Sequence, residues 1–392
     1  MSFDLRRDLG RTGDVIEACS DGECGHLLAL TMLPKMGPRR LRHLIDRWGP
    51  CLAWQRIRSR QPLQVTVPGE VLNDWYDASA LVDPAETRDQ HRRAKVQWAM
   101  RAGSGYPQRL VNDPEPPEIL FWRGTQQALA QPTVGIVGTR RCTRYGRDVA
   151  FELGAALGQA GVGVVSGLAI GIDAAAHAGT LQHGGVPIAV VGGGADVVYP
   201  RRNAGLWTDV VAHGLLVTEQ AMGIAPQRWM FPARNRIIAG LSDVVVVVES
   251  PATGGSMYTV DAALERDRPV FAVPGPIRSA ASVGTNRLLA DGAHPYCSPS
   301  DVLEALGLIT PGLPPGCMSE EITRDAVGDQ TDRTGAKVLD ALGWQSQTVD
   351  RLAARTGLSA SLIAVQLQLL MAAGHVVSRD GWYERTSVKD RR

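Results

Sequence analysis

Apolar residues recur with the period of a helix through the first hundred positions of the chain. Between residues 26 and 50 they predict a helix, a short turn at Met36-Gly37-Pro38 and a second helix. This arrangement resembles a helix-hairpin-helix, whose turn amides can contact a DNA phosphate. We favour a plain helical domain instead, in which Arg39, Arg40 and Arg42 lie on a solvated face.

The pattern changes to short β-branched runs near residue 132. Before that point, residues 71–101 are expected to add helix, and the proline-rich stretch 106–124 is expected to be an extended connection. The run of five valines at 244–248 has no polar position, which indicates a strand buried on both faces of a parallel sheet. Strands separated by helical stretches are predicted at 133–138, 162–166, 186–191 and 243–249.

A winged helix is predicted at the C-terminal end. Residues 309–332 are rich in proline, glycine and charge, and they are read as a linker. A helix, a helix–turn–helix and a short hairpin around Asp380-Gly381 follow in the order of a winged helix. The third helix, ASLIAVQLQLLMAAG, carries no lysine or arginine, although a reader of the major groove takes its contacts from that helix. We therefore favour a protein-interaction or regulatory domain over a DNA reader.

These patterns divide the chain into four parts. We predict an N-terminal helical domain at 1–104, an α/β domain with a parallel sheet at 105–308, the linker at 309–332 and the winged helix at 333–392. A chain of 392 residues is long enough for these domains and for a sizeable core.

Composition indicates a cytoplasmic globular protein. Apolar residues make up 44% of the chain and charged residues 21%, which is ordinary for soluble domains. No apolar run is long enough to span a bilayer and the N-terminus lacks the apolar core of a secretory signal, so no membrane partner is expected. The six cysteines form no C-x-x-C pair, which favours reduced thiols over a metal site.

The basic residues are almost all arginine. The net charge is only +1, so the chain is not globally basic, and only four of its 41 basic residues are lysine. The guanidinium of arginine can donate two parallel hydrogen bonds to a phosphate and can stack on the face of a base, which the ammonium of lysine cannot. The position of the arginines therefore matters more than their number.

Several unusual loops follow the predicted strands. Gly138-Thr139-Arg140 follows the first strand and Ser166-Gly167 follows the second. Loops at the carboxyl ends of parallel strands line the ligand-binding edge of a sheet, and glycines, hydroxyls and amides there suit a phosphate. Neither the G-x-G-x-x-G fingerprint nor a P-loop is present, so the pattern indicates a phosphate-bearing ligand of another kind.

Two segments repeat the order aromatic, proline, arginine, asparagine. One contains Arg201, Arg202 and Asn203, and the other contains Phe231, Arg234, Asn235 and Arg236. Each offers a ring for base stacking, forked donors for phosphate and an amide for a base edge, which is what single-stranded nucleic acid requires. The alternative is ordinary helix-start chemistry with solvated arginines. Two occurrences beside one sheet edge favour the nucleic-acid interpretation.

The titratable residues are interpreted as structural. Asp173 and His177 share a helix face and could perform acid–base chemistry, but no third partner is evident. We expect the aspartate to accept backbone amides and the histidine to orient the turn. Glu219 and Glu249 end two strands, and we expect them to hold Arg234 or Arg236 in ion pairs. No catalytic residue, metal or cofactor is predicted.

Seven blocks follow in the order and spacing of the DprA/Smf DNA-processing proteins. They are VGIVGTRRCTRYG, VVSGLAIGIDAAAH, VGGGADVVYPRRN, VTEQAMG, FPARNRIIAGLSD, VVVVESPATGGSMYTVDAAL and FAVPGPIRSAASVGTNRLLADGA. The resemblance spans about 105–300, and the flanking helical (SAM or helix-hairpin-helix-like) and winged-helix domains look like those of many members. It implies an extended Rossmann-like α/β domain, a homodimer, sequence-independent binding of single-stranded DNA, and loading of a RecA-type recombinase during DNA-mediated transformation.

The resemblance also implies a strand-binding site. Carried over residue by residue, that site comprises Gly138, Thr139, Arg140, Ser166, Gly167, Arg201, Phe231, Arg234 and Asn235. We expect the arginines to neutralise phosphates, Phe231 to stack or support the site, and the backbone amides of Gly138, Ser166 and Gly167 to add donors.

The sequence, with this resemblance, thus predicts a non-enzymatic mediator of recombination that binds single-stranded DNA, protects incoming DNA and loads a RecA-type recombinase. The main alternative is a nucleotide hydrolase or phosphoribohydrolase, in which Glu219 or Glu249 acts near Gly254-Gly255-Ser256. A protein-only scaffold is a third interpretation. Binding of oligo-dT without release of base or phosphate would separate the first from the second.

Overall fold

The fold comprises two compact units, Met1–Ile309 and Thr310–Arg392, and each is described by itself. It was obtained as a computed structural model, which describes residues 21–101, 103, 105–309, 331–343, 346–379 and 381–386. The predicted linker at 309–332 lies mostly outside the described residues.

Four helices form the N-terminal part of the first unit. They are α1 (Asp21–Thr31), α2 (Pro38–Arg58), α3 (Gly69–Leu81) and α4 (Pro84–Arg93). Leu41 and Leu44, three residues apart on the second predicted helix, are both buried, as the helical period of apolar residues leads one to expect. Arg42 of the expected solvated face is 39% exposed, and its guanidinium also forms an ion pair with Glu118. The helix expected up to residue 101 is wrong in its last part, where a strand replaces it.

A nine-stranded sheet forms the centre of the first unit. Its order is β1-β2-β6-β5-β4-β3-β7-β8-β9. The strands are β1 (Gln97–Met100), β2 (Ile119–Gly124), β3 (Thr133–Val137), β4 (Gly163–Ser166), β5 (Pro187–Val190), β6 (Leu215–Thr218), β7 (Val244–Val247), β8 (Val270–Ala272) and β9 (His294–Pro295). The four predicted strands are confirmed as β3, β4, β5 and β7, and the ladders from β6 to β9 are parallel.

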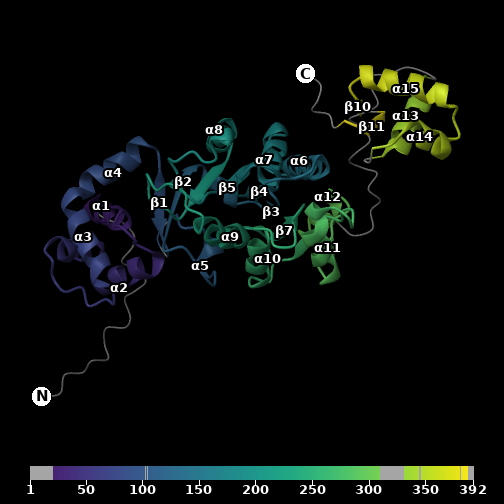
Figure 1. The fold of residues 1–392 in the computed structure, drawn as a ribbon. Helices are drawn as coiled ribbons and strands as arrows, with labels where there is room; N and C mark the ends of the chain where they lie inside the picture. Colours follow the sequence, from purple (N-terminus) through teal and green to yellow (C-terminus); the bar gives the residue numbers. More distant parts are fainter. Residues whose placement is uncertain are drawn as a thin grey trace, which may run out of the picture. The chain divides into compact units, whose positions relative to one another are not determined.

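The sheet extends beyond its predicted start. The stretch expected to be a connection contains β2, which pairs antiparallel with β6 in the register Phe121 to Thr218. β1 adds to the same edge, also antiparallel. The sheet is therefore mostly parallel, with an antiparallel extension that joins it to the N-terminal helices (Figure 1).

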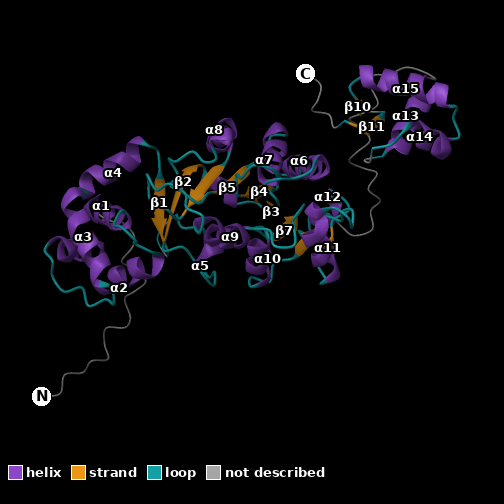
Figure 2. Cartoon of the chain, in the orientation of Figure 1, coloured by secondary structure: helices purple, strands orange, loops and turns teal. Residues whose placement is uncertain are grey.

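Helices cover both faces of the sheet (Figures 1 and 2). The helices α6 (Arg144–Gln159), α7 (Ile172–Gln182) and α8 (Ala204–His213) lie on one face, and α9 (Met230–Leu241) and α10 (Met257–Leu264) lie on the other. All four residues of β7 are buried, which confirms the interpretation of the valine run. The remaining elements are α5 (Gln108–Val111), α11 (Val283–Ala290), α12 (Pro299–Ala305) and the 3₁₀ turns Gln126–Leu129, Arg201–Asn203 and Ala280–Ser282.

Helices α6 and α7 pack at very short range. A Cβ atom on Gly179 would lie 2.0 Å from the carbonyl oxygen of Phe151 and 3.1 Å from the amide nitrogen of Ala155. These are backbone atoms of α6, so only glycine permits this approach. The two helices can then bury their small apolar residues against one face of the sheet.

The strand order reverses direction at β3. From β3 the chain adds β4, β5 and β6 on one side, and then returns to place β7, β8 and β9 on the other. In an open parallel sheet the loops on either side of such a switch point diverge and leave a crevice at the carboxyl ends of the strands. The loops after β3 and β7 therefore frame the place where a ligand is expected.

The second unit is a winged helix, as predicted. It contains α13 (Thr331–Leu342), α14 (Val349–Thr356), α15 (Ala360–Ala372) and an antiparallel pair, β10 (Val376–Arg379) and β11 (Trp382–Arg385). Gly357 ends α14 in the left-handed conformation, and the hydroxyl of Ser359 accepts the amide of Leu362 to start α15. The exposed face of α15 is apolar, with Leu362, Val365 and Leu369 between 39% and 55% exposed.

Within the described ranges, no helix has both the length and the apolar character needed to cross a bilayer.

Candidate nucleic-acid interface

A cavity of about 340 Å³ opens at the switch point between β3 and β7. The loop Gly138–Arg141 after β3 forms one wall, and Pro251 with Gly254–Ser256 after β7 forms another. The first turns of α9 close it with Phe231, Pro232, Arg234 and Asn235. Three of the segments singled out in the sequence thus meet at one place.

The loop after β3 is held in a fixed position. The amide of Thr139 donates to the carbonyl of Glu249 at 2.8 Å, which ties this loop to the end of β7. A Cβ atom on Gly138 would lie 2.6 Å from the side chain of Ile172, so this position accepts only glycine without a shift. The loop therefore presents Arg140 at a defined point of the cavity wall.

Arg140 lies over an aromatic ring. Its side chain is exposed, and its guanidinium carbon is 4.7 Å from the ring centroid of Phe231. The ring of Tyr199 lies 5.6 Å from that of Phe231, tilted by 32°. A cation and two rings in sequence provide both a phosphate ligand and stacking faces for bases. Tyr199 was part of the repeated motif but was not among the predicted site residues.

A smaller cavity of about 70 Å³ adjoins the first on the other side of Phe231. Arg140, Phe231 and Arg234 line both cavities, while Tyr199 and Pro200 line only the smaller one. The segment that begins at Tyr199 is therefore at the same edge of the sheet as the segment that begins at Phe231. Arg201 and Arg202 follow directly and are exposed on the 3₁₀ turn. The amide of Asn203 is already engaged, because it donates to the carbonyl of Leu168 at 2.9 Å.

Arg234 is almost completely buried between the two cavities. Only 6% of its surface is exposed, and it donates to the carbonyl of Val190 and, at 3.0 Å, to the side-chain oxygen of Asn235. Asn235 in turn donates to the carbonyl of Gly255 at 3.0 Å. Burial lowers the pKa of Arg234 to about 10, and the carboxylate of Asp173 opposes that shift. The guanidinium remains charged at neutral pH and directs positive potential into both cavities.

Gly167 makes room for this guanidinium. A Cβ atom there would lie 2.0 Å from Nη2 of Arg234 and 2.3 Å from its Cζ. The donor role expected for the amide of Gly167 was wrong, because this amide already donates to Asp173 at 3.1 Å. The hydroxyl of Ser166 is also engaged, since it donates to the carbonyl of Ile136 at 2.6 Å and the residue is fully buried. The hydroxyl of Ser166 is therefore not free, and the donor role expected for its backbone amide stays a prediction.

Asp173 has the structural role that we expected, and the expectation that His177 orients the turn stays a prediction. Asp173 accepts the amides of Gly167 and Ala169, and burial raises its pKa while the charge of Arg234 holds it down. His177 is fully buried, and burial lowers its pKa to about 3. A histidine that is neutral and enclosed at neutral pH is poorly suited to proton transfer.

The two strand-end glutamates have different partners. Glu219 forms an ion pair with Arg236 at 2.6 Å, as expected. The expectation for Glu249 was wrong, because its carboxylate accepts the amide of Thr143 at 2.8 Å and its hydroxyl at 2.5 Å. Glu249 therefore fixes the start of α6. Arg236 is not brought to the switch-point cavity, and instead lines a separate groove beside the N-terminal helices.

Comparison with known proteins agrees with these features. Residues 97–307 match the family model of DNA recombination-mediator protein A, and residues 323–381 match that of the DprA winged helix domain. The chain is 36% identical over 262 residues to Protein Smf of Synechocystis sp., covering 66% of each chain. It is 40% identical over 264 residues to the DNA processing protein DprA of Bacillus subtilis, covering 65% of this chain and 89% of that one.

A solved structure is also similar. The X-ray structure of DNA processing protein A from Streptococcus pneumoniae superposes with a TM-score of 0.58 at 30% identity, covering 73% of this chain and 98% of that chain. The similarity in sequence and in fold therefore extends over most of the described residues.

Proposed function

Because the chain belongs to the DNA recombination-mediator protein A family of DNA-processing proteins, we propose that it binds single-stranded DNA without sequence preference and loads a RecA-type recombinase onto it during DNA-mediated transformation. The strand lies along the carboxyl edge of the sheet, at the β3–β7 switch point. Arg140, Arg201 and Arg202 contact phosphates, and the ring of Phe231 stacks on a base.

The observation that carries this proposal is the placement of Arg140 over Phe231 at the mouth of the cavity. An exposed arginine can turn to a phosphate and leave the ring face free for a base. Stacking on an aromatic ring tolerates every base, and phosphate contacts carry no sequence information, so the pair suits binding without sequence preference. Gly138 and Thr139 allow the backbone of the strand to approach, and Arg234 with Asn235 supplies charge and a polar floor.

Arg140→Ala should weaken binding of oligo-dT and of mixed-sequence oligonucleotides by the same factor. One phosphate contact contributes roughly 0.7 to the slope of log K against log salt concentration. Relative to 1 M salt, where this contribution vanishes, the contact raises the affinity about 5-fold at 0.1 M salt. Titrations by fluorescence anisotropy across a salt series measure both quantities. Arg287→Ala is the matched control, because Arg287 of α11 is 75% exposed and, among the described residues, pairs only with Asp291 just after the end of that helix. Unchanged affinity and slope in Arg140→Ala would remove this residue from the site.

The hydrolase alternative is disfavoured by the partners of the two glutamates. Glu249 accepts two hydrogen bonds from Thr143, and Glu219 is paired with Arg236, so both carboxylates have structural partners. Ser256 donates to the hydroxyl of Ser250 at 2.9 Å, which engages the loop that a hydrolase would use. We therefore propose that the protein performs no hydrolysis.

Glu249→Gln should lower the free energy of unfolding by about 1–3 kcal/mol, because an amide cannot accept both bonds from Thr143 and a hydrogen bond to the buried, charged carboxylate is lost. Wild type and variant should both give no product from nucleoside monophosphates, ATP or single-stranded DNA. Chemical denaturation and chromatography of the reaction mixtures measure the two effects. A product made by the wild type and lost in Glu249→Gln would establish the hydrolase instead.

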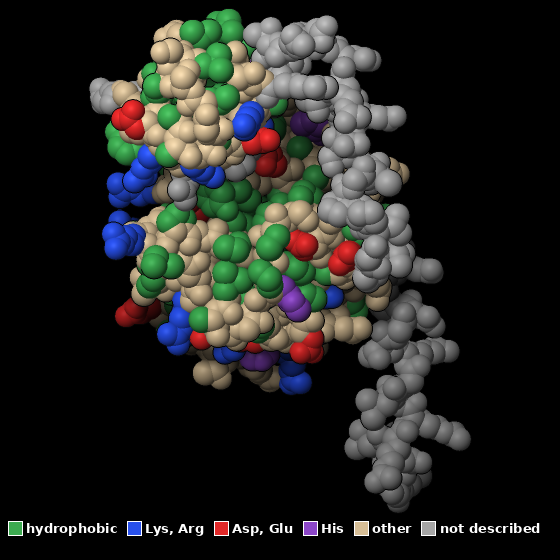
Figure 3. All heavy atoms as spheres, turned by 90° about the vertical axis from the view of Figure 1, so that its right-hand side faces the viewer, with side chains coloured by type: hydrophobic (Ala, Val, Ile, Leu, Met, Phe, Trp, Pro, Cys, Tyr) green, Lys and Arg blue, Asp and Glu red, His purple; other side chains and the backbone are tan. Residues whose placement is uncertain are grey.

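We also propose that the protein is a homodimer and that the winged helix binds protein rather than DNA. Large apolar side chains are exposed on the first unit, with Tyr258 56%, Ile277 88% and Val283 44% exposed. Figure 3 shows hydrophobic side chains gathered on the side of the sheet unit that faces the viewer. The uncharged, apolar face of α15 supports a protein partner for the winged helix.

A further inference from the structure

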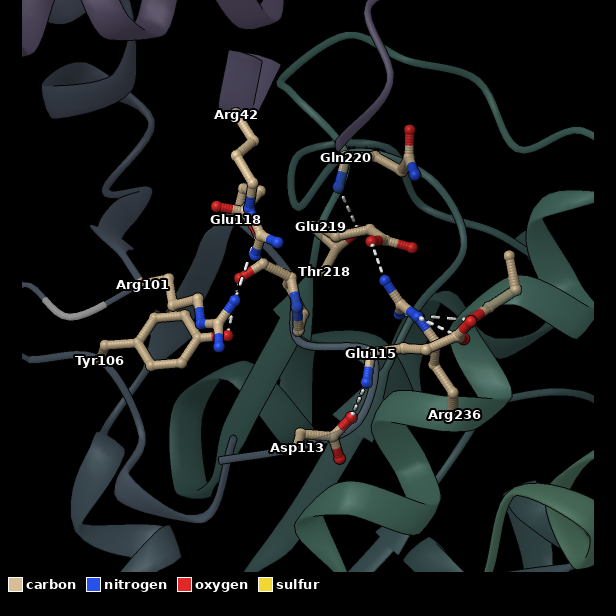
Figure 4. A network of polar contacts seen from close by, with 12 residues as sticks. Arg42, Arg101, Tyr106, Asp113, Glu115, Glu118, Thr218, Glu219, Gln220 and Arg236 are labelled. Carbon is tan, nitrogen blue, oxygen red and sulfur yellow. Dashed lines mark hydrogen bonds and ion pairs between the residues drawn. The ribbon is translucent and has the colours of Figure 1, made fainter. Parts of the chain in front are cut away.

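A groove of about 630 Å³ lies between the N-terminal helices and the sheet. The start of α2 forms one wall with Gly37, Pro38 and the arginines that follow them, and the loop 114–118 forms the other. Arg236 of α9 also lines the groove. Figure 4 shows this region from close by, with Arg42 directed at Glu118 and Arg236 placed between Glu219 and Glu115.

The groove carries an excess of positive charge. Four arginines line it against two glutamates. Glu118 is 13% exposed and is already paired with Arg42, and Arg101 lies 3.9 Å from the same carboxylate oxygen. Arg39 is exposed and Arg40 is partly exposed. Among the described residues, the guanidinium of Arg40 donates only to a backbone carbonyl, that of Lys35. The excess charge therefore belongs to the two arginines nearest to solvent.

Helix α9 connects this groove to the first site. Phe231 and Arg234 face the switch-point cavity, whereas Arg236, two residues later, points into the groove. Trp229, at the start of the helix, is 60% exposed, and its neighbour Arg228 is exposed as well. An exposed ring and basic side chains beside the first site are the features that let a protein follow a single strand.

We propose that the groove binds backbone phosphates of the same single-stranded DNA through Arg39, Arg40 and Arg236, as a continuation of the path that begins at Arg140 and Phe231. This inference rests on the function proposed above. Glu115 limits the affinity, because it is 66% exposed and 3.8 Å from Arg236, where it competes with a phosphate.

The double variant Arg39→Gln/Arg40→Gln tests the groove. With oligo-dT of about 30 nucleotides, loss of two phosphate contacts should flatten the salt slope by about 1.4 and lower affinity about 25-fold at 0.1 M salt. Oligo-dT of about 4 nucleotides is at the lower end of the lengths that a single binding domain covers, so it fills the first site without extending into the groove. Its affinity should therefore not change. Arg47→Gln/Arg60→Gln is the matched control, since both arginines are exposed in the same helical part, carry the same charge and lie outside the groove.

A second pair of variants tests the groove by a gain of affinity. Glu115→Gln should strengthen binding of the long oligonucleotide roughly 2- to 5-fold, the range of an exposed ion pair, and leave the short one unchanged. Glu265→Gln is its control, because Glu265 is 67% exposed and 3.7 Å from Arg266, away from the groove. These changes lie on the surface and leave the core intact.

The outcomes separate the two proposals. Length-dependent loss in the arginine variant and gain in Glu115→Gln support the groove. Equal effects in test and control variants, or equal loss with short and long oligonucleotides, would overturn the groove and leave the first site standing. Failure of the wild type to bind any oligonucleotide would overturn the proposed function, and the groove with it.

Discussion

Gly167→Ala is expected to lower the affinity for single-stranded DNA roughly 10- to 100-fold, the largest effect of any single methyl group in the site. The new Cβ would lie 2.0 Å from Nη2 of Arg234, so the guanidinium must leave its position. It then loses the carbonyl of Val190, and Asp173 loses the positive charge beside it. Arg234 then no longer directs its charge into the two cavities. Loss of one charge-assisted interaction with a phosphate costs about 1.5–3 kcal/mol, which corresponds to this range of affinity.

A double-mutant cycle with Arg234→Ala shows whether the methyl group acts through the arginine. If it does, Gly167→Ala should add almost nothing to the loss already caused by Arg234→Ala, because contacting residues are not additive. Anisotropy titrations of the four proteins, with circular dichroism to verify folding, provide the measurement. Wild-type affinity in folded Gly167→Ala would show that a buried Arg234 is not required for binding.

Gly179→Ala is expected to lower the free energy of unfolding by about 3 kcal/mol or more, at the upper end of the cost of overpacking. The added methyl would lie 2.0 Å from a backbone oxygen of α6, and backbone cannot move aside as a side chain can. The melting temperature should fall by about 6–12 °C for a unit of this size. Differential scanning calorimetry measures the change directly.

Gly205→Ala is the matched control for this substitution. Gly205 also lies in a helix, α8, and a Cβ there would have no neighbour within 4 Å. Alanine is the better helix former, so this variant should be neutral or more stable by up to about 1 kcal/mol. An equal loss of stability in both variants would show that the α6–α7 approach is not what Gly179 provides.

The parallel core could be predicted because the residue pattern of each strand there indicates, by itself, that both faces of the strand are buried. An all-apolar β-branched run such as Val244–Val247 has few other places to lie than between two helical layers. The antiparallel edge was missed for the opposite reason. β2 lies among prolines and its partner β6 is far away in the chain, so no local pattern marks the pairing.

The candidate site also has a part that could be predicted from the local sequence and a part that could not. The loops after β3 and β7 could be placed at the carboxyl edge from the strand pattern, and Phe231 was expected to stack. The internal partners could not be predicted. Thr143 and Glu249 are 106 residues apart, and the contact between Gly167 and the guanidinium of Arg234 exists only when α9 packs on the sheet. Which donors remain free for a ligand is decided by such long-range contacts.

The pairing of β2 with β6 also sets an order of events while the chain is being made. Ribosomes add about 5–20 residues per second, so β6 emerges about 5–20 seconds after β2. Until then, Leu120 and Phe121, which are at most 1% exposed in the finished fold, form the open edge of a two-stranded ribbon with β1. An apolar edge of this kind is a template for pairing with other chains. The nascent polypeptide, rather than the mature protein, is therefore the form most exposed to aggregation and most dependent on chaperones.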